Sequence, residues 1–156
     1  MPTIGLITCS DSRDESQDTA GATLKELIAQ AHYDLAGYQL VKDNVQAIAD
    51  AIKNMYESSY PDVIITCGGT GLSPRDVTPE ATRLVCERDI PGIAEYLRSH
   101  GLKFTENACL SRAICMQIGK TIVVNFPGSK RAATQNWEAF ADILPHAIKM
   151  ACGGGH

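Results

Sequence analysis

The sequence predicts an α/β fold in which helices cover both faces of a mainly parallel sheet. Short apolar and β-branched segments alternate along the chain with segments of helical period. Continuous apolar runs are typical of strands that are buried on both faces. The strands expected from these runs are residues 3–8, 39–41, 63–66 and 121–124. Because strands and helices alternate, the connections favour parallel strands.

Two helices between the first three strands are indicated by apolar residues three and four positions apart. The first helix has its apolar face at Leu24, Leu27, Ile28 and Ala31, and the second at Val45, Ile48, Ala49, Ile52 and Met55. This spacing places the apolar residues on one side of each helix. Each helix therefore has one face to bury against the sheet.

Three successive helices are expected in the long segment between residues 78 and 118. Thr78 followed by Pro79 predicts a helix that begins with Thr78 as its N-cap. Helix ends are expected at glycines and at a proline-glycine pair, namely Pro91-Gly92, Gly101 and Gly119. We therefore expect this segment to contain helices and no strand.

The composition is that of one ordinary globular domain. The 156 residues are 44% hydrophobic and 21% charged, which excludes a disordered chain. We expect a single domain over residues 1–152, followed by a flexible, glycine-rich tail over residues 153–156. The last helical region, residues 132–150, is expected to kink or divide at Pro145.

Charge and hydropathy limit the expected partners and compartment. The formal net charge is −4, and basic residues are scattered apart from the pair Lys130 and Arg131, so no nucleic-acid partner is expected. No apolar stretch approaches the roughly 18 residues of a membrane span, and the N-terminal segment lacks a basic, cleavable leader pattern. We therefore expect a cytoplasmic protein with no membrane partner.

The cysteines are interpreted as reduced and mostly buried thiols. The six positions are Cys9, Cys67, Cys86, Cys109, Cys115 and Cys152. Most of them lie in apolar segments, and no two have CxxC spacing. Structural zinc sites normally use closely spaced ligand pairs, so neither a zinc site nor a disulfide framework is expected.

A glycine loop is the most informative local feature. Gly68, Gly69, Thr70 and Gly71 follow an apolar strand. Glycine lets the backbone approach a ligand closely and permits positive φ, so that successive N–H groups form a nest for anionic oxygens. In open α/β sheets, ligands bind at the carboxyl ends of strands. The alternative is a plain tight turn with no ligand.

The residues after this loop indicate a phosphate-bearing ligand. The guanidinium of Arg75 can neutralise phosphate, and the carboxylate of Asp76 can hold Mg²⁺. The chain contains no GxGxxG that opens a helix directly after a strand and no GxxxxGK[ST]. A dinucleotide oxidoreductase or a P-loop hydrolase is therefore disfavoured.

Polar residues also follow the first two strands. Asp43 stands between the second strand and the second helix, so it serves either a ligand or the helix as its N-cap. Ser10 and Asp11 begin a polar loop after the first strand. This loop is longer than a cap needs, although Asp18 or Thr19 within it can cap the first helix.

Pro127, Gly128 and Ser129 form a fourth such loop, between the last strand and the final helical region. The N–H groups at a helix N-terminus attract phosphate, and Ser129 and Lys130 add a hydroxyl and a positive charge. A proline-glycine turn without a ligand is the alternative. The coincidence of four anion-tolerant loops after four strands favours ligand binding.

Together these residues resemble the molybdopterin-binding family of molybdenum-cofactor biosynthesis, which includes molybdopterin adenylyltransferase. The similarity extends over about residues 3–150 and is most specific in Gly68 to Gly71 and in residues 75–81. Supporting positions are Ser10-Asp11, Asp18 to Gly21, Asp43, Ser111-Arg112 and Pro127-Gly128-Ser129.

The resemblance implies a three-layer α/β/α sandwich with a mixed, mainly parallel sheet, assembled as a homotrimer or a dimer of trimers. It implies a nucleotidyltransferase that converts molybdopterin and Mg²⁺-ATP into adenylyl-molybdopterin and pyrophosphate. By resemblance, Asp43 and Asp76 are the catalytic and Mg²⁺-binding residues, and the capping interpretation of Asp43 is set aside. The substrates are expected to contact Ser10, Asp11, Gly68, Gly69, Thr70, Gly71, Arg75, Pro127, Gly128 and Ser129.

A second function is kept beside the enzyme, namely a non-catalytic molybdopterin-binding or scaffold paralogue of the same pathway. The pair Asp43 and Asp76 favours the enzyme, because anion binding alone gives no reason to place two carboxylates beside the ligand. An unrelated nucleotide enzyme of similar topology is disfavoured by the absence of the standard motifs.

Overall fold

The computed structural model describes residues 1–155. Its elements, in chain order, are β1 (Thr3–Cys9), the 3₁₀ turn η1 (Glu15–Gln17), α1 (Thr19–Gln30), β2 (Asp34–Val41), α2 (Val45–Ser59), β3 (Val63–Cys67), α3 (Thr78–Val85), β4 (Arg88–Asp89), α4 (Pro91–Gly101), the 3₁₀ turn η2 (Glu106–Leu110), β5 (Cys115–Ile118), β6 (Thr121–Phe126) and α5 (Lys130–Ala151). The four sequence-predicted strands are all present, and each extends beyond its predicted range.

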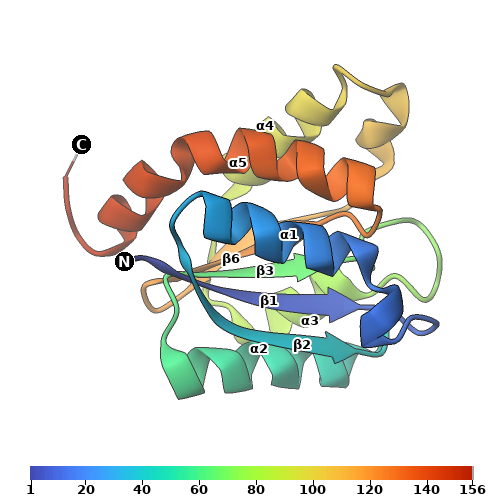
Figure 1. The fold of residues 1–156 in the computed structure, drawn as a ribbon, viewed down its shortest axis with the longest axis horizontal. Coiled ribbons are helices and arrows are strands. Elements are labelled where there is room, and N and C mark those ends of the chain that lie inside the picture. The colour runs from blue at the N-terminus through green and yellow to red at the C-terminus, as the bar shows by residue number, and fades with distance from the viewer. Residues whose placement is uncertain (156) are drawn as a thin grey trace.

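The strands form one six-stranded sheet in the order β2-β1-β3-β6-β5-β4. Strands β1, β2, β3 and β6 are parallel, whereas β5 is antiparallel to both β6 and β4. Figure 1 shows the sheet between two helical layers, with α1, α4 and α5 above it and α2 and α3 below. The predicted α/β/α sandwich with a mixed, mainly parallel sheet is confirmed.

Alternate residues along the central strands pack into separate cores on the two faces of the sheet. Ile65 packs with residues of α1 and α5 on one face, whereas its neighbour Ile64 packs with residues of α2 on the other. Both side chains are fully buried. Since successive side chains of a strand point to opposite faces, a strand covered on both sides must be apolar throughout.

The segment between α3 and β6 differs from the prediction of three helices. The third predicted helix is replaced by the short η2 and by β5, and Gly119 lies in the β5–β6 turn with φ 55° rather than at a helix end. Strand β5 is only four residues long and includes the polar Gln117, and so short a segment fits a strand as well as a buried helical turn.

Two details at helix ends also differ from expectation. Thr78 is the first residue of α3 and not its N-cap, which is Val77. The hydroxyl of Thr78 instead donates to the carbonyl of Gly68 at 2.9 Å. Pro145 lies inside α5 without dividing it. The flexible tail stays a prediction, and His156 lies outside the described residues.

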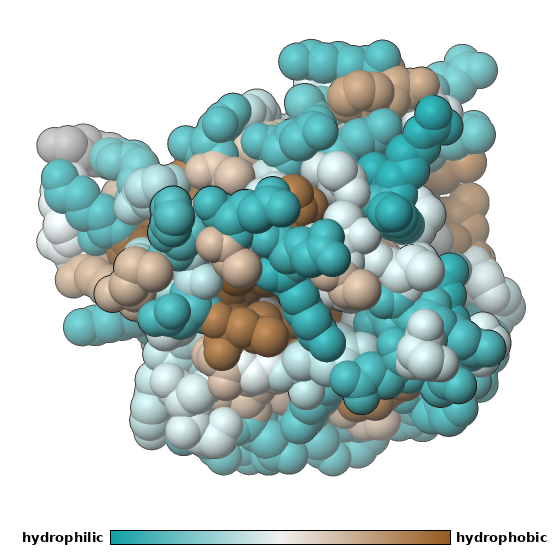
Figure 2. Space-filling model, viewed as in Figure 1, coloured by the Kyte–Doolittle hydropathy of each residue, from teal (hydrophilic) through white to brown (hydrophobic). Residues whose placement is uncertain are grey.

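The cysteines are free thiols, but they are less uniformly buried than expected. Cys9, Cys67 and Cys115 are buried, whereas Cys109 and Cys152 are exposed. Within residues 1–155, no helix combines the length and apolar character that a membrane crossing requires. On the face shown in Figure 2, hydrophilic side chains cover most of the surface, and hydrophobic atoms appear in separate groups between them.

A buried carboxylate joins the start of α1 to the sheet. Asp18 is 3% exposed and caps α1 by accepting from the N–H of Gly21 at 3.0 Å. It also accepts from the hydroxyls of Thr8 at 2.7 Å and Tyr38 at 2.6 Å. These contacts satisfy the buried charge and connect α1 to β1 and β2.

Replacing Asp18 by alanine is expected to lower the free energy of unfolding by at least about 2 kcal/mol, because a cap is lost and two buried hydroxyls lose their acceptor. Urea denaturation measures the change. Asp14→Ala is the matched control, since Asp14 caps the exposed η1 turn. Its replacement should lower the free energy of unfolding by about 1 kcal/mol or less. Equal losses in the two variants would contradict the role given to Asp18.

Candidate active site

Loops after four parallel strands meet at one edge of the sheet. In Figure 1 the arrowheads of β1, β2 and β3 all point to the right, so the loops that follow them lie together on that side. They enclose a polar cavity of ≈ 240 Å³. Its lining consists of Thr8, Cys9, Ser10, Asp11, Ser12, Arg13, Asp43, Cys67, Gly68, Gly69, Asp76 and Gly128.

The glycine loop adopts a conformation that only glycine adopts readily. Gly68 has φ 105° and Gly69 has φ 69°. A Cβ atom at Gly68 would lie 2.5 Å from the carbonyl oxygen of Cys9, and one at Gly69 would lie 2.2 Å from the hydroxyl oxygen of Thr78. Both contacts are shorter than packed atoms permit. The loop therefore depends on glycine for its backbone angles and for its closeness to β1 and α3.

Most N–H groups of this loop remain available. The N–H of Gly68 donates to the carbonyl of Phe126 at 2.9 Å, so it does not serve a ligand. Among residues 1–155, the N–H groups of Gly69, Thr70 and Gly71 have no acceptor. The predicted nest is thus reduced to three donors, which still suit anionic oxygens.

Asp43 does not cap α2, because its neighbour does. Asn44 is the N-cap and its side chain accepts from the N–H of Ala47 at 2.9 Å. One oxygen of Asp43, Oδ2, accepts from the N–H of Asp11 at 3.0 Å, and Asp11 Oδ1 accepts from the N–H of Asp43 at 3.0 Å. The other oxygen of Asp43, Oδ1, is buried without a hydrogen-bond partner. The capping interpretation is therefore wrong, and among residues 1–155 Oδ1 of Asp43 is a buried acceptor without a donor.

As in Asp43, one carboxylate oxygen of Asp76 accepts a hydrogen bond from the described residues and the other does not. Its Oδ2 accepts from the N–H of Ser73 at 3.0 Å, while Oδ1 has no partner among residues 1–155. Arg112 holds this loop in place, because its Nη2 donates to the carbonyl of Asp76 at 2.6 Å and its Nε donates to the carbonyl of Gly71 at 2.8 Å. Glu80 on α3 pairs with Arg112 Nη1 at 2.7 Å.

The carboxyl group of Asp43 is in an unfavourable environment for its charged form. Burial raises the pKa of Asp43 above its usual value, and the negative charges of Asp11 and Asp76 raise it further. In contrast, the hydrogen bond from Arg75 lowers the pKa of Asp11. Repulsion among like charges is a feature of sites that bind cations or catalyse reactions.

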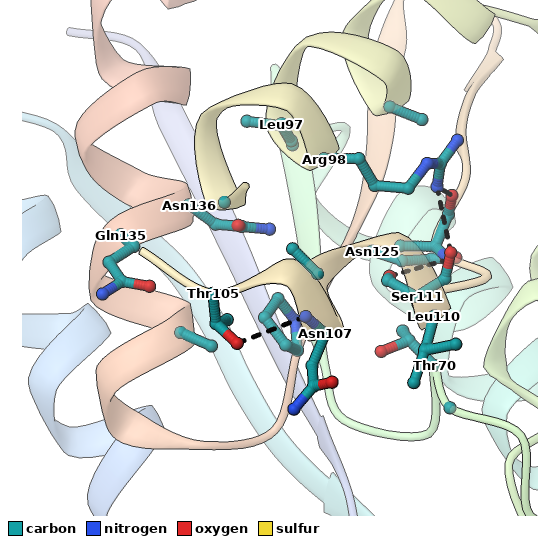
Figure 3. A pocket seen from close by; sticks show the side chains of 17 residues that line it. Thr70, Leu97, Arg98, Thr105, Asn107, Leu110, Ser111, Asn125, Gln135 and Asn136 are labelled. Atoms are coloured by element: carbon teal, nitrogen blue, oxygen red, sulfur yellow. Dashed lines mark hydrogen bonds between the residues drawn. The ribbon is translucent and has the colours of Figure 1, made fainter. Parts of the chain in front are cut away.

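A second cavity, of ≈ 270 Å³, lies on the other side of the glycine loop (Figure 3). Its walls come from α4, η2 and the first turns of α5, together with Thr70, Gly71 and Pro127. Most of its lining atoms are apolar, and small residues such as Ala94, Gly101, Ala108, Ala113 and Ala132 contribute many of them. Gln135 and Asn136 of α5 add half-buried amide groups that have no hydrogen-bond partner among residues 1–155. This cavity suits a flat, mostly apolar ligand with a polar edge.

The predicted site residues are divided among three places. Seven line the polar cavity, namely Ser10, Asp11, Asp43, Gly68, Gly69, Asp76 and Gly128. Thr70, Gly71 and Pro127 line the apolar cavity. Arg75 and Ser129 line neither cavity. Arg75 pairs with Asp11 at 2.8 Å, and the hydroxyl oxygen of Ser129 caps α5 by accepting from the N–H of Ala132.

Several lining residues were not assigned from the sequence. Arg13 was visible as a basic residue in a polar loop, but nothing local indicated that its side chain turns inward. Cys9 and Cys67 have the pattern of core residues, and burial raises the pKa of each thiol to about 12. They therefore stay protonated at neutral pH and do not supply a nucleophile. Nothing in the sequence around Gln135 and Asn136 indicated a site, because only the folded structure brings their helix next to the glycine loop.

Comparison with known proteins shows a family match over most of the sequence. Residues 5–146 match the family described as probable molybdopterin binding domain. The chain belongs to this family. The glycine loop and the aspartates of the polar cavity lie within the matched residues.

Relatives of the chain include proteins of similar length and a much longer one. The chain is 30% identical over 154 residues to molybdopterin adenylyltransferase of Helicobacter pylori strain J99, with 96% of this chain and 88% of that protein aligned. It is 36% identical over 152 residues to molybdenum cofactor synthesis protein cinnamon of Drosophila melanogaster, covering 95% of this chain. The chain spans only 25% of the Drosophila protein.

A solved structure of the family has the same fold. The crystal structure of the molybdopterin biosynthesis enzyme MoaB from Thermus thermophilus superposes with a TM-score of 0.90 at 40% sequence identity. The alignment covers 98% of each chain. The family fold therefore extends over nearly the whole sequence.

Asp43→Asn is expected to raise the melting temperature at pH 7. The folded pKa of Asp43 is raised, so between the unfolded value of about 3.9 and the folded value the native state binds more protons than the unfolded chain. The free energy of unfolding falls as pH rises through that window. Ionised Asp43 thus destabilises the fold at neutral pH, and a neutral amide removes this effect.

Thermal unfolding at pH 7 and at about pH 3 measures this difference. At about pH 3 both the folded and unfolded forms of Asp43 are protonated, so the gain should disappear. Asp50→Asn, on the exposed side of α2, removes the same charge without burial and should change the melting temperature less. A lower melting temperature of Asp43→Asn at pH 7 would show that its charge supports the fold.

Proposed function

We propose that the protein is a molybdopterin adenylyltransferase, which transfers the adenylyl group of ATP to molybdopterin and releases pyrophosphate. The observation that carries the proposal is the pair Asp43 and Asp76 in one polar cavity beside the glycine loop. Each of them has one carboxylate oxygen held by a backbone N–H and one without a partner. The 30% identical adenylyltransferase of Helicobacter pylori supports the same conclusion.

The two cavities suit the two chemically different parts of the substrates. The polar cavity offers donors and carboxylates for phosphate groups and a metal, whereas the apolar one offers a mostly apolar space of ≈ 270 Å³ for a heterocycle. We assign the pterin ring to the apolar cavity, because the amides of Gln135 and Asn136 both donate and accept hydrogen bonds. A pterin edge carries N–H and C=O groups side by side and matches such amides. The glycine loop then lies where the two substrates meet.

Asp43 and Asp76 fit Mg²⁺ as its protein ligands. The ion is usually held by one or two carboxylates together with substrate phosphates and water. Within residues 1–155, no three His, Cys, Asp or Glu side chains are arranged to hold a metal. With two carboxylate ligands, Mg²⁺ would have its remaining coordination positions open to phosphate oxygens and water. When bound, Mg²⁺ would offset the negative charge that develops on the triphosphate. The buried, unpaired Oδ1 of Asp43 is the atom that most needs such a partner.

The chain's own residues then have to bind and align two anions. The phosphate of molybdopterin is already a nucleophile, so no general base is required. It attacks the α-phosphorus of ATP, a new P–O bond forms, and the bond to the bridging oxygen breaks as pyrophosphate leaves. The free N–H groups of Gly69 and its neighbours can hold phosphate oxygens during this displacement. Positioning and charge stabilisation supply most of the catalysis in such transfers.

Asp43→Asn and Asp76→Asn are each expected to lower the rate of adenylyl transfer at least about a hundredfold, the effect of losing one preorganised electrostatic group. Removing a carboxylate also removes repulsion toward bound anions, so molybdopterin affinity should hold or increase. Single-turnover transfer at saturating Mg²⁺-ATP measures the rate, and circular dichroism checks the fold.

The matched control for these variants is Asp50→Asn, which removes one exposed charge of α2 away from the cavity and should leave transfer unchanged. Wild-type rates in both site variants would contradict the two-aspartate mechanism. Absence of pyrophosphate release by the wild-type protein, with molybdopterin still bound, would favour the non-catalytic scaffold.

Asn136→Ala is expected to weaken molybdopterin binding about three- to tenfold, the size of one neutral hydrogen bond, and to leave the KM for ATP unchanged. Fluorescence titration with molybdopterin and steady-state kinetics with ATP separate the two effects. Thr134→Ala is the control, because Thr134 belongs to the same helix but does not line the cavity. A change in the KM for ATP alone would place the nucleotide base, not the pterin, in the apolar cavity.

A further inference from the structure

Arg13 occupies a central place in the polar cavity. The hydroxyl oxygen of Ser10 accepts from the N–H of Arg13 at 3.2 Å, which turns the loop after β1 back toward the sheet. The half-buried side chain reaches the turn after β6, where Nη1 donates to the carbonyl of Gly128 at 3.1 Å. A Cβ atom at Gly128 would lie 3.2 Å from the Cα of Gly68. Arg13 therefore lies where the loops after β1, β3 and β6 meet.

Arg13 has more uncommitted donors than the other two arginines near the site. A guanidinium carries five N–H donors, and Arg13 uses one of them within residues 1–155. Arg75 directs both Nε and Nη2 to Asp11, and its side chain is 68% exposed. All three nitrogens of Arg112 are bound, to two backbone carbonyls and to Glu80. Only Arg13 can meet a ligand without first breaking an ion pair.

The charge of the cavity also requires a cation at this place. Three carboxylates line it, from Asp11, Asp43 and Asp76, and Arg13 is the one basic side chain among the lining residues. A polyphosphate brought beside three carboxylates would be repelled. Arginine suits this task because its planar fork donates two parallel hydrogen bonds to phosphate oxygens.

We propose that Arg13 is the phosphate-binding arginine of the polar cavity and donates its uncommitted N–H groups to phosphate oxygens of a bound substrate. This assigns to Arg13 the neutralising role that the sequence suggested for Arg75. The existence of the anion site rests on the cavity, whereas the identity of the phosphate, from ATP or from molybdopterin, rests on the proposed function. Arg75 is left to hold Asp11 and thereby the loop after β1.

Calorimetric titration at fixed salt tests the proposal with three probes, namely Mg²⁺-pyrophosphate, Mg²⁺-ATP and molybdopterin. Arg13→Gln should weaken binding of at least one probe by about tenfold or more, as expected for a lost charge-assisted hydrogen bond. Arg13→Lys should lose less affinity for that probe, because lysine keeps the positive charge but lacks the planar guanidinium. Arg88→Gln is the control, since it removes the same charge from an exposed residue of the edge strand β4 and should bind as wild type.

The probe whose binding is weakened identifies the phosphate that Arg13 contacts. A loss confined to pyrophosphate and ATP places Arg13 on the nucleotide, and a loss confined to molybdopterin places it on that phosphate. Unchanged binding of all three probes by Arg13→Gln overturns the proposal, as does a wild-type protein that binds none of them. Thermal unfolding checks the variants, whose midpoints should move by no more than about 5 °C because a single hydrogen bond to Gly128 is lost.

Activity is measured separately, so that the two proposals can fail independently. A wild-type protein that binds pyrophosphate through Arg13 and transfers no adenylyl group would contradict the adenylyltransferase and support the arginine site. A protein that transfers adenylate with equal KM values in the wild type and in Arg13→Gln would overturn the arginine site and support the enzyme.

Discussion

The close approach of backbones at Gly68 is the constraint on which the candidate site depends. At this residue the end of β3 passes so near β1 that a Cβ atom would lie 2.5 Å from the carbonyl oxygen of Cys9. The N–H of Gly68 also donates to Phe126 at the end of β6, and its carbonyl accepts from Thr78 at the start of α3. Because no side chain separates these segments, three loops and a helix share one small volume. The polar cavity lies within that volume and takes its shape from it.

The charge of this cavity is unfavourable for one of its carboxylates. Asp43 is partly buried beside two other carboxylates, and both burial and repulsion raise its pKa. Other carboxylates of the protein are satisfied in place, as Asp18 is by two hydroxyls and an N–H. The contrast between a fully partnered Asp18 and an incompletely partnered Asp43 separates a structural carboxylate from the one for which we propose a ligand.

Sequence patterns predicted the parts of the fold that local chemistry decides. Continuous apolar runs located the four parallel strands, since a strand covered on both faces must be apolar throughout. The glycine loop was recognised because positive φ excludes most other residues. Strand β5 was missed, because a four-residue segment with three apolar residues fits either type of element. Thr78 was taken for a cap, although the fold gives its hydroxyl a carbonyl of the glycine loop as partner.

The sequence by itself determined which residues are fit for the chemistry, and the tertiary structure decided which of them act together. Residue type and neighbours were enough to single out the glycines and Asp76, because conformational freedom and charge belong to the residue, whereas Asp43 was assigned to the site by the family resemblance. The choice of Asn44 over Asp43 as the cap of α2 depended on the backbone at that turn. The inward position of Arg13 and the outward position of Arg75 depended on contacts between loops that are distant in the sequence. Such contacts arise only when the sheet brings distant segments together, and no local pattern encodes them.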